Sequence, residues 1–426
     1  MIEWKEYKIS ELVSLNIIAK PLDGNHGGIH PTTKDYVSIG IPFVMASDIN
    51  NGNLDLTTCK FLTFEHSSKL KKGFAKEGDI LLTHKASIGR TAIVPKLNVE
   101  YIVLTPQVTY YRVLDETRLN NLYLMYYFNS VEFQNLLATF SGSGSTRAYI
   151  GITEQLNLSI KFPPIILQKQ IAEILSSLDD KIEINNKINQ ELETLAQTLF
   201  KQWFIDFEFP NENGEPYKSS GSEMLDSELG EIPKGWKVDS LDNIAEFLNG
   251  LALQKFPPES DYEFLPVIKI RELRQKDTSN SDKASVNIPE KYIIEDGDVL
   301  FSWSGSLMID FWTNGKGALN QHLFKVTSKE YPKWYYYLWT KHHLSEFIEI
   351  AESKATTMGH IQRQHLTNAK VVIPTENTIL NFSLVFEPII SKIIDNRIEC
   401  GDLINLRDKL LSKLISGELS INEITN

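Results

Sequence analysis

The chain has 426 residues, of which 42% are hydrophobic and 10% aromatic, so two or three domains with apolar cores are expected and wholesale disorder is excluded. Its two cysteines lie far apart in sequence, which excludes a disulfide framework and a zinc signature and favours a reducing compartment. The formal net charge is −12, but residues 166–235 alone carry 6 basic and 14 acidic side chains. The larger flanking regions are close to neutral and can still present basic faces, so nucleic-acid binding remains open.

The beginning of the chain gives no sign of export. Its first residues, MIEWKEYKIS, have no apolar core of the kind found in signal peptides. We find no apolar run that approaches the ~20 residues needed to span a bilayer. We therefore expect a cytoplasmic protein without a membrane segment.

Residues 1–165 are predicted to form a β-rich globular block. Within it, Glu77-Gly78-Asp79 precedes an apolar run, a pattern that predicts a tight turn into a buried strand. An aromatic helix-like segment is expected at 122–128 and a Ser/Thr/Gly loop at 141–147. The block is predicted to end in a strand that stops at Pro163-Pro164.

A long helix is predicted from about residue 167 to 204. Apolar side chains recur there at spacings of three and four residues, which is the pattern of a coiled-coil stripe. Asn185 lies within this stripe, and one polar residue in such a position can fix helix register. The expected apolar members of the stripe are Ile171, Leu175, Leu178, Ile182, Ile188, Leu192, Leu195 and Leu199.

The pattern of the first half then repeats. Residues 208–235, rich in Pro, Gly, Ser and Glu, are predicted to form an ordered but irregular linker to a second block at 236–378. A second helical pattern runs from about 379 to 415, and Pro388 and Gly401 predict a kink or a late start in it. The matching segments of the second block are Trp236-Lys237, Asp296–Phe301, Leu319–His322, Trp334–Trp339 and Ala355–His360.

These patterns predict an α+β fold with an internal pseudo-twofold repeat. The two helices, assigned to 166–207 and 379–420, most simply bury their stripes by packing antiparallel as a coiled coil. They would then join two β-rich globular blocks and hold them at opposite ends of a rod. The aromatic run Trp334–Trp339 is interpreted as core, because its spacing is helical.

We find no catalytic constellation in the sequence. It contains no GxxxxGK[ST] loop, no GxSxG elbow and no HExxH pair. The stretch Ser141–Ser145 contains glycines without a following lysine, so a contact loop is favoured over a phosphate-binding loop. We expect no catalytic residue, no bound cofactor and no metal site in this chain.

The order and duplication of several weak motifs resemble the DNA-specificity subunits of type I restriction–modification systems, over essentially the whole chain. The resembling segments are Gly78–Leu81, Gly297–Leu300, Ile88-Gly89-Arg90, Leu319–His322, Thr356–Ile361, Pro163-Pro164 with Gln168 and Gln170, Leu229–Trp236 and Leu414–Leu419. Thr105-Pro106-Gln107 departs from Asn320-Gln321-His322, its counterpart in the second block, so loop chemistry need not be shared between the halves.

The resemblance implies that each block is a target-recognition domain reading one half of a bipartite site in double-stranded DNA. The helices would dock two methyltransferase subunits, which carry S-adenosylmethionine and methylate adenine at N6 after flipping it out. Restriction subunits that use ATP and Mg²⁺ would complete the complex. The chain itself would be a non-catalytic subunit.

Candidate DNA-contacting residues are chosen by side-chain chemistry and loop position. Base edges are read by side chains such as Arg, Lys, Asn and Gln, and phosphates also accept bonds from Ser and Thr. The alternative for each is an ordinary exposed loop residue. A basic run at 69–72 is interpreted as a solvated face. The candidates are Lys85, Ser87, Arg90, Ser143, Ser145, Thr146 and Arg147 in the first block, and Ser302, Ser304, Ser306, Asn314, Lys316, Asn320, Gln321, Thr356, Thr357, His360 and Arg363 in the second.

Two other hypotheses remain open. One is a scaffold without nucleic-acid binding, consisting of two β-rich binding modules on a coiled-coil rod. The other is a stand-alone enzyme with an unrecognised site. Salt-dependent DNA binding would argue against the scaffold, and methylation or cleavage by the isolated chain would favour the enzyme.

Overall fold

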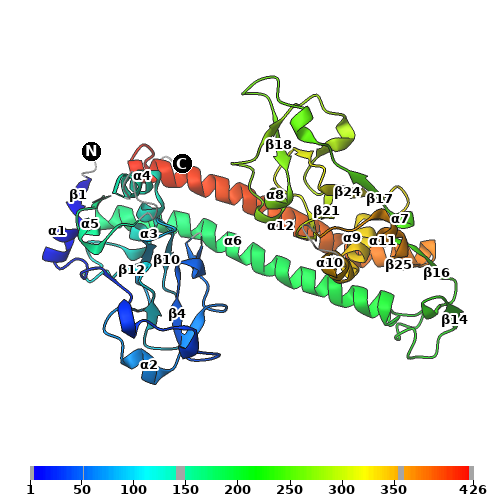
Figure 1. Cartoon of the computed structure of the whole chain (residues 1–426), viewed down its shortest axis with the longest axis horizontal. Helices are drawn as coiled ribbons and strands as arrows, with labels where there is room; N and C mark the ends of the chain where they lie inside the picture. Colours follow the sequence, from blue (N-terminus) through cyan, green and yellow to red (C-terminus); the bar gives the residue numbers. More distant parts are fainter. Residues whose placement is uncertain (1–3, 51, 141–148, 354–358, 422–426) are drawn as a thin grey trace. The chain divides into compact units, whose positions relative to one another are not determined.

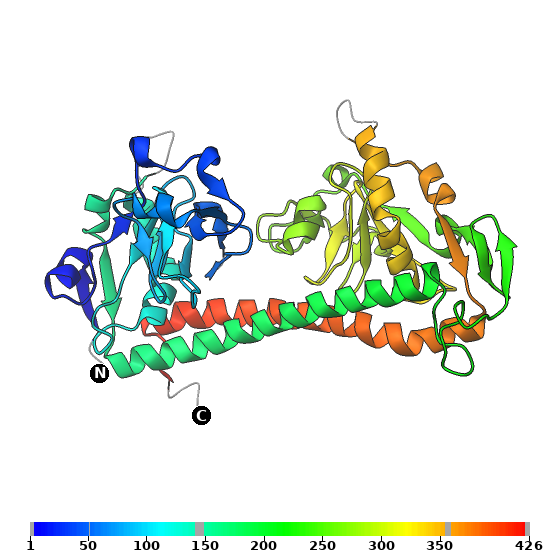
Figure 2. The same cartoon turned by 90° about the horizontal axis from the view of Figure 1, so that it is seen from below.

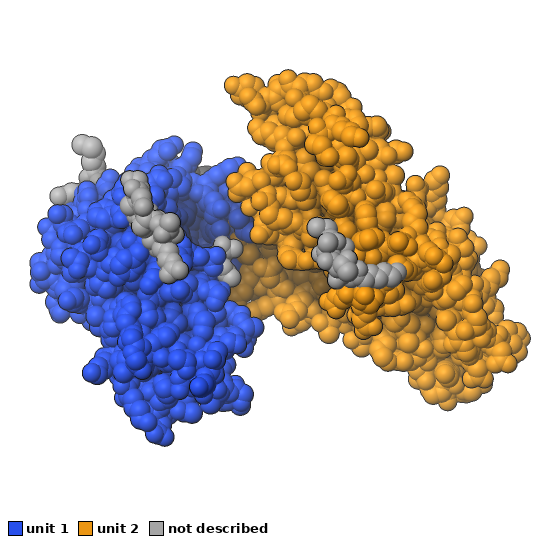
Figure 3. Space-filling view, viewed as in Figure 1, with its two compact units in different colours: residues 1–180, 404–426 blue, residues 181–403 orange. Residues whose placement is uncertain are grey.

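The computed structural model describes residues 4–50, 52–140, 149–353 and 359–421. The chain divides into two compact units, coloured blue and orange in Figure 3. Unit 1 consists of residues 1–180 and 404–426, and unit 2 consists of residues 181–403. Each unit therefore contains one globular block together with a segment of each of two long helices.

Unit 1 is built from short strands and helices around two sheets. Its four-stranded sheet has the order β10-β9-β12-β2, and its five-stranded sheet has the order β3-β7-β4-β11-β8. Strand β1 pairs with β13, and β5 pairs with β6. The elements are β1 (Lys5–Lys8), α1 (Ile9–Ser14), β2 (Leu22–Asp23), η1 (Gly27–Ile29), η2 (Thr33–Asp35), β3 (Tyr36–Val37), β4 (Ile41–Val44), η3 (Ala46–Asp48), β5 (Ile49–Asn50), β6 (Asn53–Leu54), β7 (Lys60–Leu62), α2 (Phe64–Ser68), β8 (Phe74–Ala75), β9 (Ile80–Thr83), β10 (Thr91–Ile93), β11 (Ile102–Leu104), β12 (Val108–Tyr111), α3 (Asn121–Asn129), α4 (Val131–Phe140), α5 (Ile152–Gln155) and β13 (Ser159–Phe162).

Unit 2 contains two four-stranded sheets with the orders β17-β24-β21-β22 and β19-β18-β23-β20, and the pairs β16–β25 and β14–β15. Helix α9 packs on β22 and β24, next to α10 (Figure 1). The elements are β14 (Met224–Ser227), β15 (Gly230–Pro233), β16 (Lys237–Ser240), α7 (Leu241–Ile244), β17 (Glu246–Asn249), η5 (Leu253–Lys255), β18 (Leu265–Ile268), α8 (Ile270–Gln275), β19 (Lys283–Ala284), η6 (Glu290–Tyr292), β20 (Ile293–Ile294), β21 (Val299–Ser302), β22 (Met308–Phe311), β23 (Gly317–Leu319), β24 (Leu323–Thr327), α9 (Lys333–His342), α10 (Leu344–Ser353), α11 (Arg363–Asn368) and β25 (Lys370–Ile373).

The two units repeat the same topology, which confirms the predicted internal repeat. The sheet β2-β12-β9-β10 of unit 1 has its counterpart in β17-β24-β21-β22 of unit 2. The other sheet of each unit contains one parallel pair of strands, which is β4 with β11 in unit 1 and β18 with β23 in unit 2. The strand that opens each block pairs antiparallel with the strand that closes it, β1 with β13 and β16 with β25.

The predicted Gly-Asp turns are formed in both units. Gly78 and Gly297 have φ values of +81° and +85°, a region that residues with a Cβ seldom adopt. The carboxylate that follows each glycine closes the turn by accepting a backbone N–H, with Asp79 bonded to Lys76 at 2.7 Å and Asp298 bonded to Glu295 at 2.8 Å. Each turn leads directly into a fully buried strand, β9 or β21.

The aromatic segments form helices that fill the cores. In α3, six consecutive residues from Tyr123 to Phe128 are buried, and in α9 the seven residues from Trp334 to Thr340 are buried. Phe311 on β22 packs against Tyr337 in a tilted arrangement, with 4.1 Å between ring centroids. The interpretation of the Trp334–Trp339 run as core is therefore confirmed.

The first long helix, α6, spans Ile165–Phe200 and ends in a π-helical turn, η4 (Lys201–Ile205). The second, α12, spans Glu376–Ser416. Inside unit 2 their segments lie side by side in both Figure 1 and Figure 2. Asn185 bonds to Glu399 at 2.8 Å, while Asn189 accepts from Asn396 at 2.9 Å and donates to the carbonyl of Ile393 at 3.2 Å. The pairing is antiparallel, because partners fall in number along α12 as they rise along α6.

The buried stripe of α6 differs in part from the prediction. Ile188 and Leu195 are exposed, at 36% and 45%, while Asn189 and Ala196 are buried. The stripe continues at alternating steps of four and three through the buried Asn185 and Asn189, the half-buried Leu192 and the buried Ala196. It therefore keeps a heptad spacing but carries small and polar residues. A coiled coil in the strict sense stays a prediction.

Helix α12 continues through the residues that were predicted to interrupt it. Pro388 and Gly401 both lie inside the helix, so neither residue ends it. The predicted late start is therefore wrong. Among the described residues α12 is the one helix long and apolar enough to cross a membrane by length and composition, with a window of mean hydropathy 1.2. Its Asn396 side chain nevertheless lies fully buried against α6.

The segment between the blocks is less irregular than predicted. It contains the antiparallel hairpin of β14 and β15. Before the hairpin, Phe209 stacks on Trp236, with 5.0 Å between ring centroids, and meets Phe382 of α12 edge-on. These contacts attach the linker to the core of unit 2.

Candidate nucleic-acid interface

The candidate site of unit 1 begins in the loop that follows β9. Thr83 closes this loop, because its hydroxyl accepts from the backbone N–H of Arg90 at 2.9 Å and donates to the carbonyl of Ser87. Ala86 has φ +65°, an uncommon value for a residue with a side chain. The loop is thus tightly shaped, and Ser87 and Arg90 are exposed on it.

Two further segments meet this loop. The backbone N–H of His84 donates to the carbonyl of Gln107 at 2.9 Å, and the N–H of Ile150 donates to the carbonyl of His84 at 3.0 Å. Lys85 forms a β-bridge with Tyr149 and places its ammonium 5.7 Å from the centre of that ring. The structure therefore brings the loop after β9 together with residues 105–107 and 149–151. The candidates Ser143, Ser145, Thr146 and Arg147 lie outside the described residues.

Unit 1 also holds polar groups that the sequence did not point to. His84 is 1% exposed and bonds to the carbonyl of Ile150, and burial lowers its pKa. Among the described residues its Nε2 has no hydrogen-bond partner, and neither has the buried hydroxyl of Thr105. Asp23, buried at the end of β2, bonds to His26 at 2.7 Å and to Lys72. Burial alone would raise the pKa of Asp23, but these two partners outweigh it and the pKa is lowered.

Lys72 belongs to the basic run predicted to be a solvated face. Its ammonium instead pairs with a carboxylate that is 4% exposed. Lys69, in the same run, forms an exposed pair with Glu65 at 2.7 Å. Lys72 therefore belongs to the polar cluster around Asp23, whereas Lys69 lies on the exposed surface.

The equivalent loop of unit 2 has the same neighbours and different side chains. The N–H of Gly305 donates to Gly359 at 2.9 Å, the N–H of Ile361 donates to Trp303 at 3.0 Å, and Ser304 forms a β-bridge with His360. Trp303 takes the place of His84. Its indole N–H donates to Asn249, the residue that takes the place of Asp23, at 3.0 Å.

The serines of this loop have different surroundings. The Ser302 side chain is buried, and its hydroxyl lies 3.1 and 2.9 Å from the carbonyls of Ser304 and Ser306, so it shapes the loop. Ser304 is 4% exposed and shares a hydrogen bond of 3.0 Å with His322 Nδ1. Ser306 is exposed. The candidates Thr356 and Thr357 lie outside the described residues.

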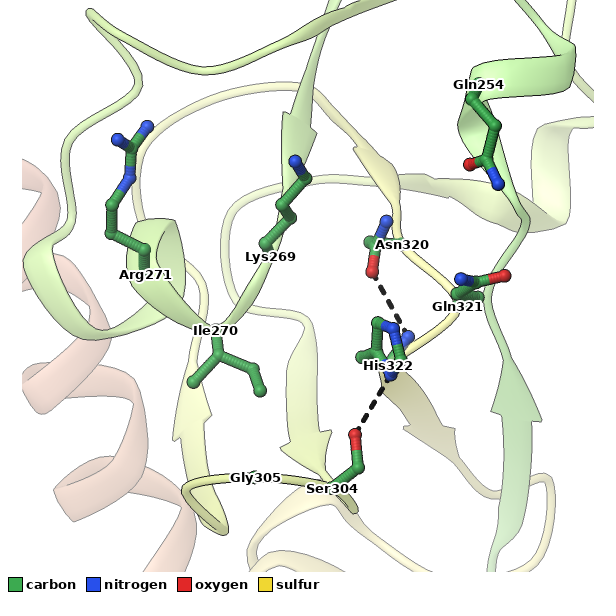
Figure 4. A pocket seen from close by; sticks show the side chains of 9 residues that line it. All are labelled: Gln254, Lys269, Ile270, Arg271, Ser304, Gly305, Asn320, Gln321 and His322. Atoms are coloured by element: carbon green, nitrogen blue, oxygen red, sulfur yellow. Dashed lines mark hydrogen bonds between the residues drawn. The ribbon is translucent and has the colours of Figure 1, made fainter. Parts of the chain in front are cut away.

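Beside this loop lies a cavity of about 390 Å³, shown in Figure 4. Of the predicted residues, Ser304, Asn320 and Gln321 line it. Gln254, Lys269 and Arg271 line it as well and were missed, because they come from η5 and from the start of α8, which are distant in sequence from the predicted loops.

Two glycines mark the backbone approach that brings Gln254 to the cavity. Gly24 and Gly250 hold equivalent positions, and a Cβ on either would lie 1.9 or 2.4 Å from the carbonyl oxygen of Leu104 or Leu319. Close backbone approach of this kind requires glycine. The two glycines mark where the segment after β2 or β17 passes the loop that carries residues 105–107 or 320–322, and Gln254 follows the second of them.

The remaining candidates of unit 2 lie elsewhere. Asn314 and Lys316 follow β22, where Lys316 pairs with Glu295 at 3.0 Å. Arg363, at the start of α11, donates to the carbonyl of Phe247 at 3.2 Å and lines a different cavity of about 460 Å³. The structure does not bring these three residues to the cavity of Figure 4. Within the described part of the chain, no three His, Cys, Asp or Glu side chains are grouped to hold a metal ion.

The chain matches the family model described as type I restriction modification DNA specificity domain over residues 1–194 and 233–410, and it belongs to this family. It is 27% identical over 412 residues to the type I restriction enzyme MjaIX specificity subunit of Methanocaldococcus jannaschii, covering 93% of this chain and 91% of that protein. It is 24% identical over 487 residues to the HindI specificity subunit of Haemophilus influenzae, covering 98% of this chain and all of that protein.

A solved structure agrees with the fold. The S subunit of a type I restriction–modification system from M. genitalium aligns over 97% of this chain and 96% of its own, with a TM-score of 0.56 and 15% sequence identity. At this identity the likeness concerns the fold, and the α+β architecture with its repeated blocks is confirmed.

Proposed function

We propose that this chain is the DNA-specificity subunit of a type I restriction–modification complex. Residues 1–165 and 236–378 would each read one half of a bipartite site in double-stranded DNA. The observation that carries the proposal is a cluster of loops that occurs in both units. The loop after β9 in unit 1, and the loop after β21 in unit 2, meets two other loops, and polar side chains gather there. Membership of the DNA specificity family supports it.

The partners belong to the same proposal. The long helices would dock two methyltransferase subunits, which bind S-adenosylmethionine and methylate adenine at N6, and restriction subunits with ATP and Mg²⁺ would add cleavage. This chain would supply recognition and no catalytic residue, and the complex would work in the cytoplasm. A base must leave the helical stack to be methylated, and the methylating subunit receives it in its own pocket. Sequence recognition can therefore lie on a different subunit.

The net charge of −12 does not oppose DNA binding by the blocks. Acidic side chains at the surface are paired in both blocks, as in Lys76–Glu100 in the first and Lys316–Glu295 in the second. Phosphate contacts act locally and depend on the cations and N–H groups of the contact surface.

Co-expression of the chain with its neighbouring methyltransferase subunit, followed by mapping of modified adenines, tests the proposal. We expect a split motif whose two specific parts are separated by a constant gap. A continuous motif, or no modification, would contradict it. DNA affinity that falls steeply with salt separates this function from a scaffold without nucleic-acid binding, because released counterions give log K a steep negative slope.

A further inference from the structure

The cavity of unit 2 contains three amide side chains whose hydrogen-bonding groups are largely unused. Within the described part of the chain, the side chains of Gln254 and Gln321 form no hydrogen bond. Asn320 accepts from the backbone N–H of His322 at 3.2 Å, while its amide nitrogen points into the cavity (Figure 4). Asn320 is 6% exposed, so a donor held there in near-complete burial faces the cavity.

The two cations of the cavity each form an ion pair with a neighbouring carboxylate. Lys269 bonds to Asp282 at 2.5 Å. Arg271 uses Nε and Nη2 on Glu272, at 2.9 and 2.5 Å, and Nη2 also donates to the carbonyl of Asn280 at 2.6 Å. These bonds use three of the five donors of the guanidinium, and the other two are both on Nη1. The guanidinium therefore has no pair of free donors on adjacent nitrogens for a bidentate contact to a base, and the Lys269 ammonium is held toward Asp282.

This distribution of donors and acceptors selects between purines. In the major groove guanine presents two acceptors, N7 and O6, and is read by paired donors such as those of arginine. Adenine presents the acceptor N7 beside the N6 amino donor, and one amide satisfies both. A cavity lined by three amides, with its guanidinium directed to Glu272 and Asn280, therefore matches adenine better than guanine.

We propose that this cavity reads the major-groove edge of an adenine in the half-site of unit 2. Gln321 or Gln254 donates to N7 and accepts from the N6 amino group, and Asn320 supplies a further donor. The inference rests on the proposed function and adds the base and the residues that read it. In unit 1 Pro106 stands where unit 2 has Gln321, so this mode of recognition belongs to one half of the site.

The test uses the full chain in complex with its methyltransferase subunit, after the motif has been mapped. Each adenine in the half read by unit 2 is replaced in turn by 7-deazaadenine, which lacks the N7 acceptor. We expect one position at which the replacement weakens binding at least about fivefold, and less than the roughly 150-fold of a whole bidentate contact, because only one of its two hydrogen bonds is lost.

Three variants assign the contact to the amides. Gln321→Glu, Gln254→Glu and Asn320→Asp keep one acceptor oxygen and lose the donor. We expect at least one variant to bind natural DNA as weakly as the wild type binds the duplex with 7-deazaadenine. The affinity of that variant should not fall further on the 7-deazaadenine duplex. Gln275→Glu is the matched control, since it makes the same charge change at an exposed position of α8 outside the cavity. It should keep wild-type affinity and wild-type sensitivity to 7-deazaadenine.

The inference is overturned if no adenine of that half is sensitive to the deaza replacement, or if 7-deazaguanine alone weakens binding. It is also overturned if all three variants retain sensitivity. The wild-type series decides the matter even if a variant fails to fold. In each of these cases the proposed function still stands if the motif is split and one of its halves depends on residues 236–378. Loss of DNA binding by the wild type would contradict both the proposed function and this inference.

Discussion

The two units share a framework and differ in the side chains that line the equivalent loops. In unit 1 the loop after β9 carries His84 and Lys85, and a buried Asp23 holds two basic side chains beside it. In unit 2 the same positions hold Trp303, Ser304 and Asn249. The turns, strand pairs and backbone bonds that position these residues are the same in both units.

The difference shows which positions are constrained by folding and which are available for recognition. Gly78 and Gly297 must adopt positive φ, and the strands that follow must be apolar because they are buried. Loop residues that face a cavity carry no such requirement. Two copies of one framework can therefore read two unrelated half-sites.

The largest expected effect is the exchange of one whole reading block. Replacing residues 236–378 with the matching block of a relative should change one half of the methylated motif completely and leave the other half intact. The reason is that each block has its own core, so its loops are shaped without residues of the other block. Mapping of modified adenines in cells that carry the chimera measures the outcome.

The reciprocal exchange of residues 1–165 is the control and should change the other half. If either chimera alters both halves, or if the motif is unchanged, the independence of the two blocks is refuted. A chimera that yields no methylation at all can be checked for folding by its unfolding transition.

A second difference concerns how each block is attached to the helices of its own unit. In unit 2 Asp310 of β22 bonds to Arg397 of α12 at 2.5 Å and to Lys276 at 2.8 Å, and Arg397 also bonds to Glu193 of α6. Asp310 is 18% exposed. In unit 1 Tyr126 of α3 donates to Asp179 of α6 at 2.6 Å. Asp179 also bonds to Arg407 of α12 at 2.7 Å and is 34% exposed.

Asp310→Asn should therefore destabilise unit 2 by about 3 kcal/mol, because it leaves the poorly solvated Lys276 without its anion and Arg397 with Glu193 alone. Asp179→Asn should cost at most about 1 kcal/mol, since a more exposed pair is better screened by water. Urea unfolding followed by tryptophan fluorescence reports on unit 2, which contains every tryptophan except Trp4. Equal costs for the two substitutions, with unit 1 followed by hydrogen exchange, would contradict this ranking.

Most of the framework could be predicted from the sequence, because repeated turns and apolar runs are local signals. The α6 stripe shows the limit of such signals. Ile188 and Leu195 fit an apolar spacing but are exposed, while Asn189 and Ala196 occupy the buried positions. Apolar residues outnumber buried positions on this helix, so only the partner α12 decides which face is covered. Pro388 does not delay the start of α12, because packing along the helix outweighs one lost hydrogen bond. The expected kink stays a prediction.

The site was harder to predict, because its residues come together from separate loops. The loops after β9 and β21 and Asn320 and Gln321 could be named, since polar residues follow buried strands there. Gln254, Lys269 and Arg271 could not, because no local pattern places η5 and α8 beside residues 320–322. The candidates Asn314, Lys316 and Arg363 have suitable chemistry, but the chain directs them to other surfaces.

A smaller effect is expected from the polar layer between α6 and α12 in unit 2. Asn396 is fully buried and donates to Asn189 at 2.9 Å. Asn396→Leu leaves the Asn189 acceptor buried without a donor, and should cost about 1–3 kcal/mol. The double variant Asn189→Leu and Asn396→Leu removes both polar groups and should recover most of that loss, because no unpaired group remains. A double variant less stable than the single one in urea unfolding would show that the layer itself adds stability.

The smallest expected effect is the acid dependence of the Asp310 network. Burial alone would raise the pKa of Asp310, but the charges and hydrogen bonds of Lys276 and Arg397 outweigh it, so the pKa is lowered in the folded state. A carboxyl with a lowered folded pKa contributes its full stability above its unfolded pKa, about 3.9, and loses it as the pH falls through the folded value. The stability difference between wild type and Asp310→Asn should therefore be largest near pH 6 and should shrink as the pH falls below about 4. Other carboxylates titrate equally in both proteins, so the difference in their stability isolates Asp310. If that difference is the same at pH 6 and pH 3, the charge of Asp310 does not attach the block to the helices.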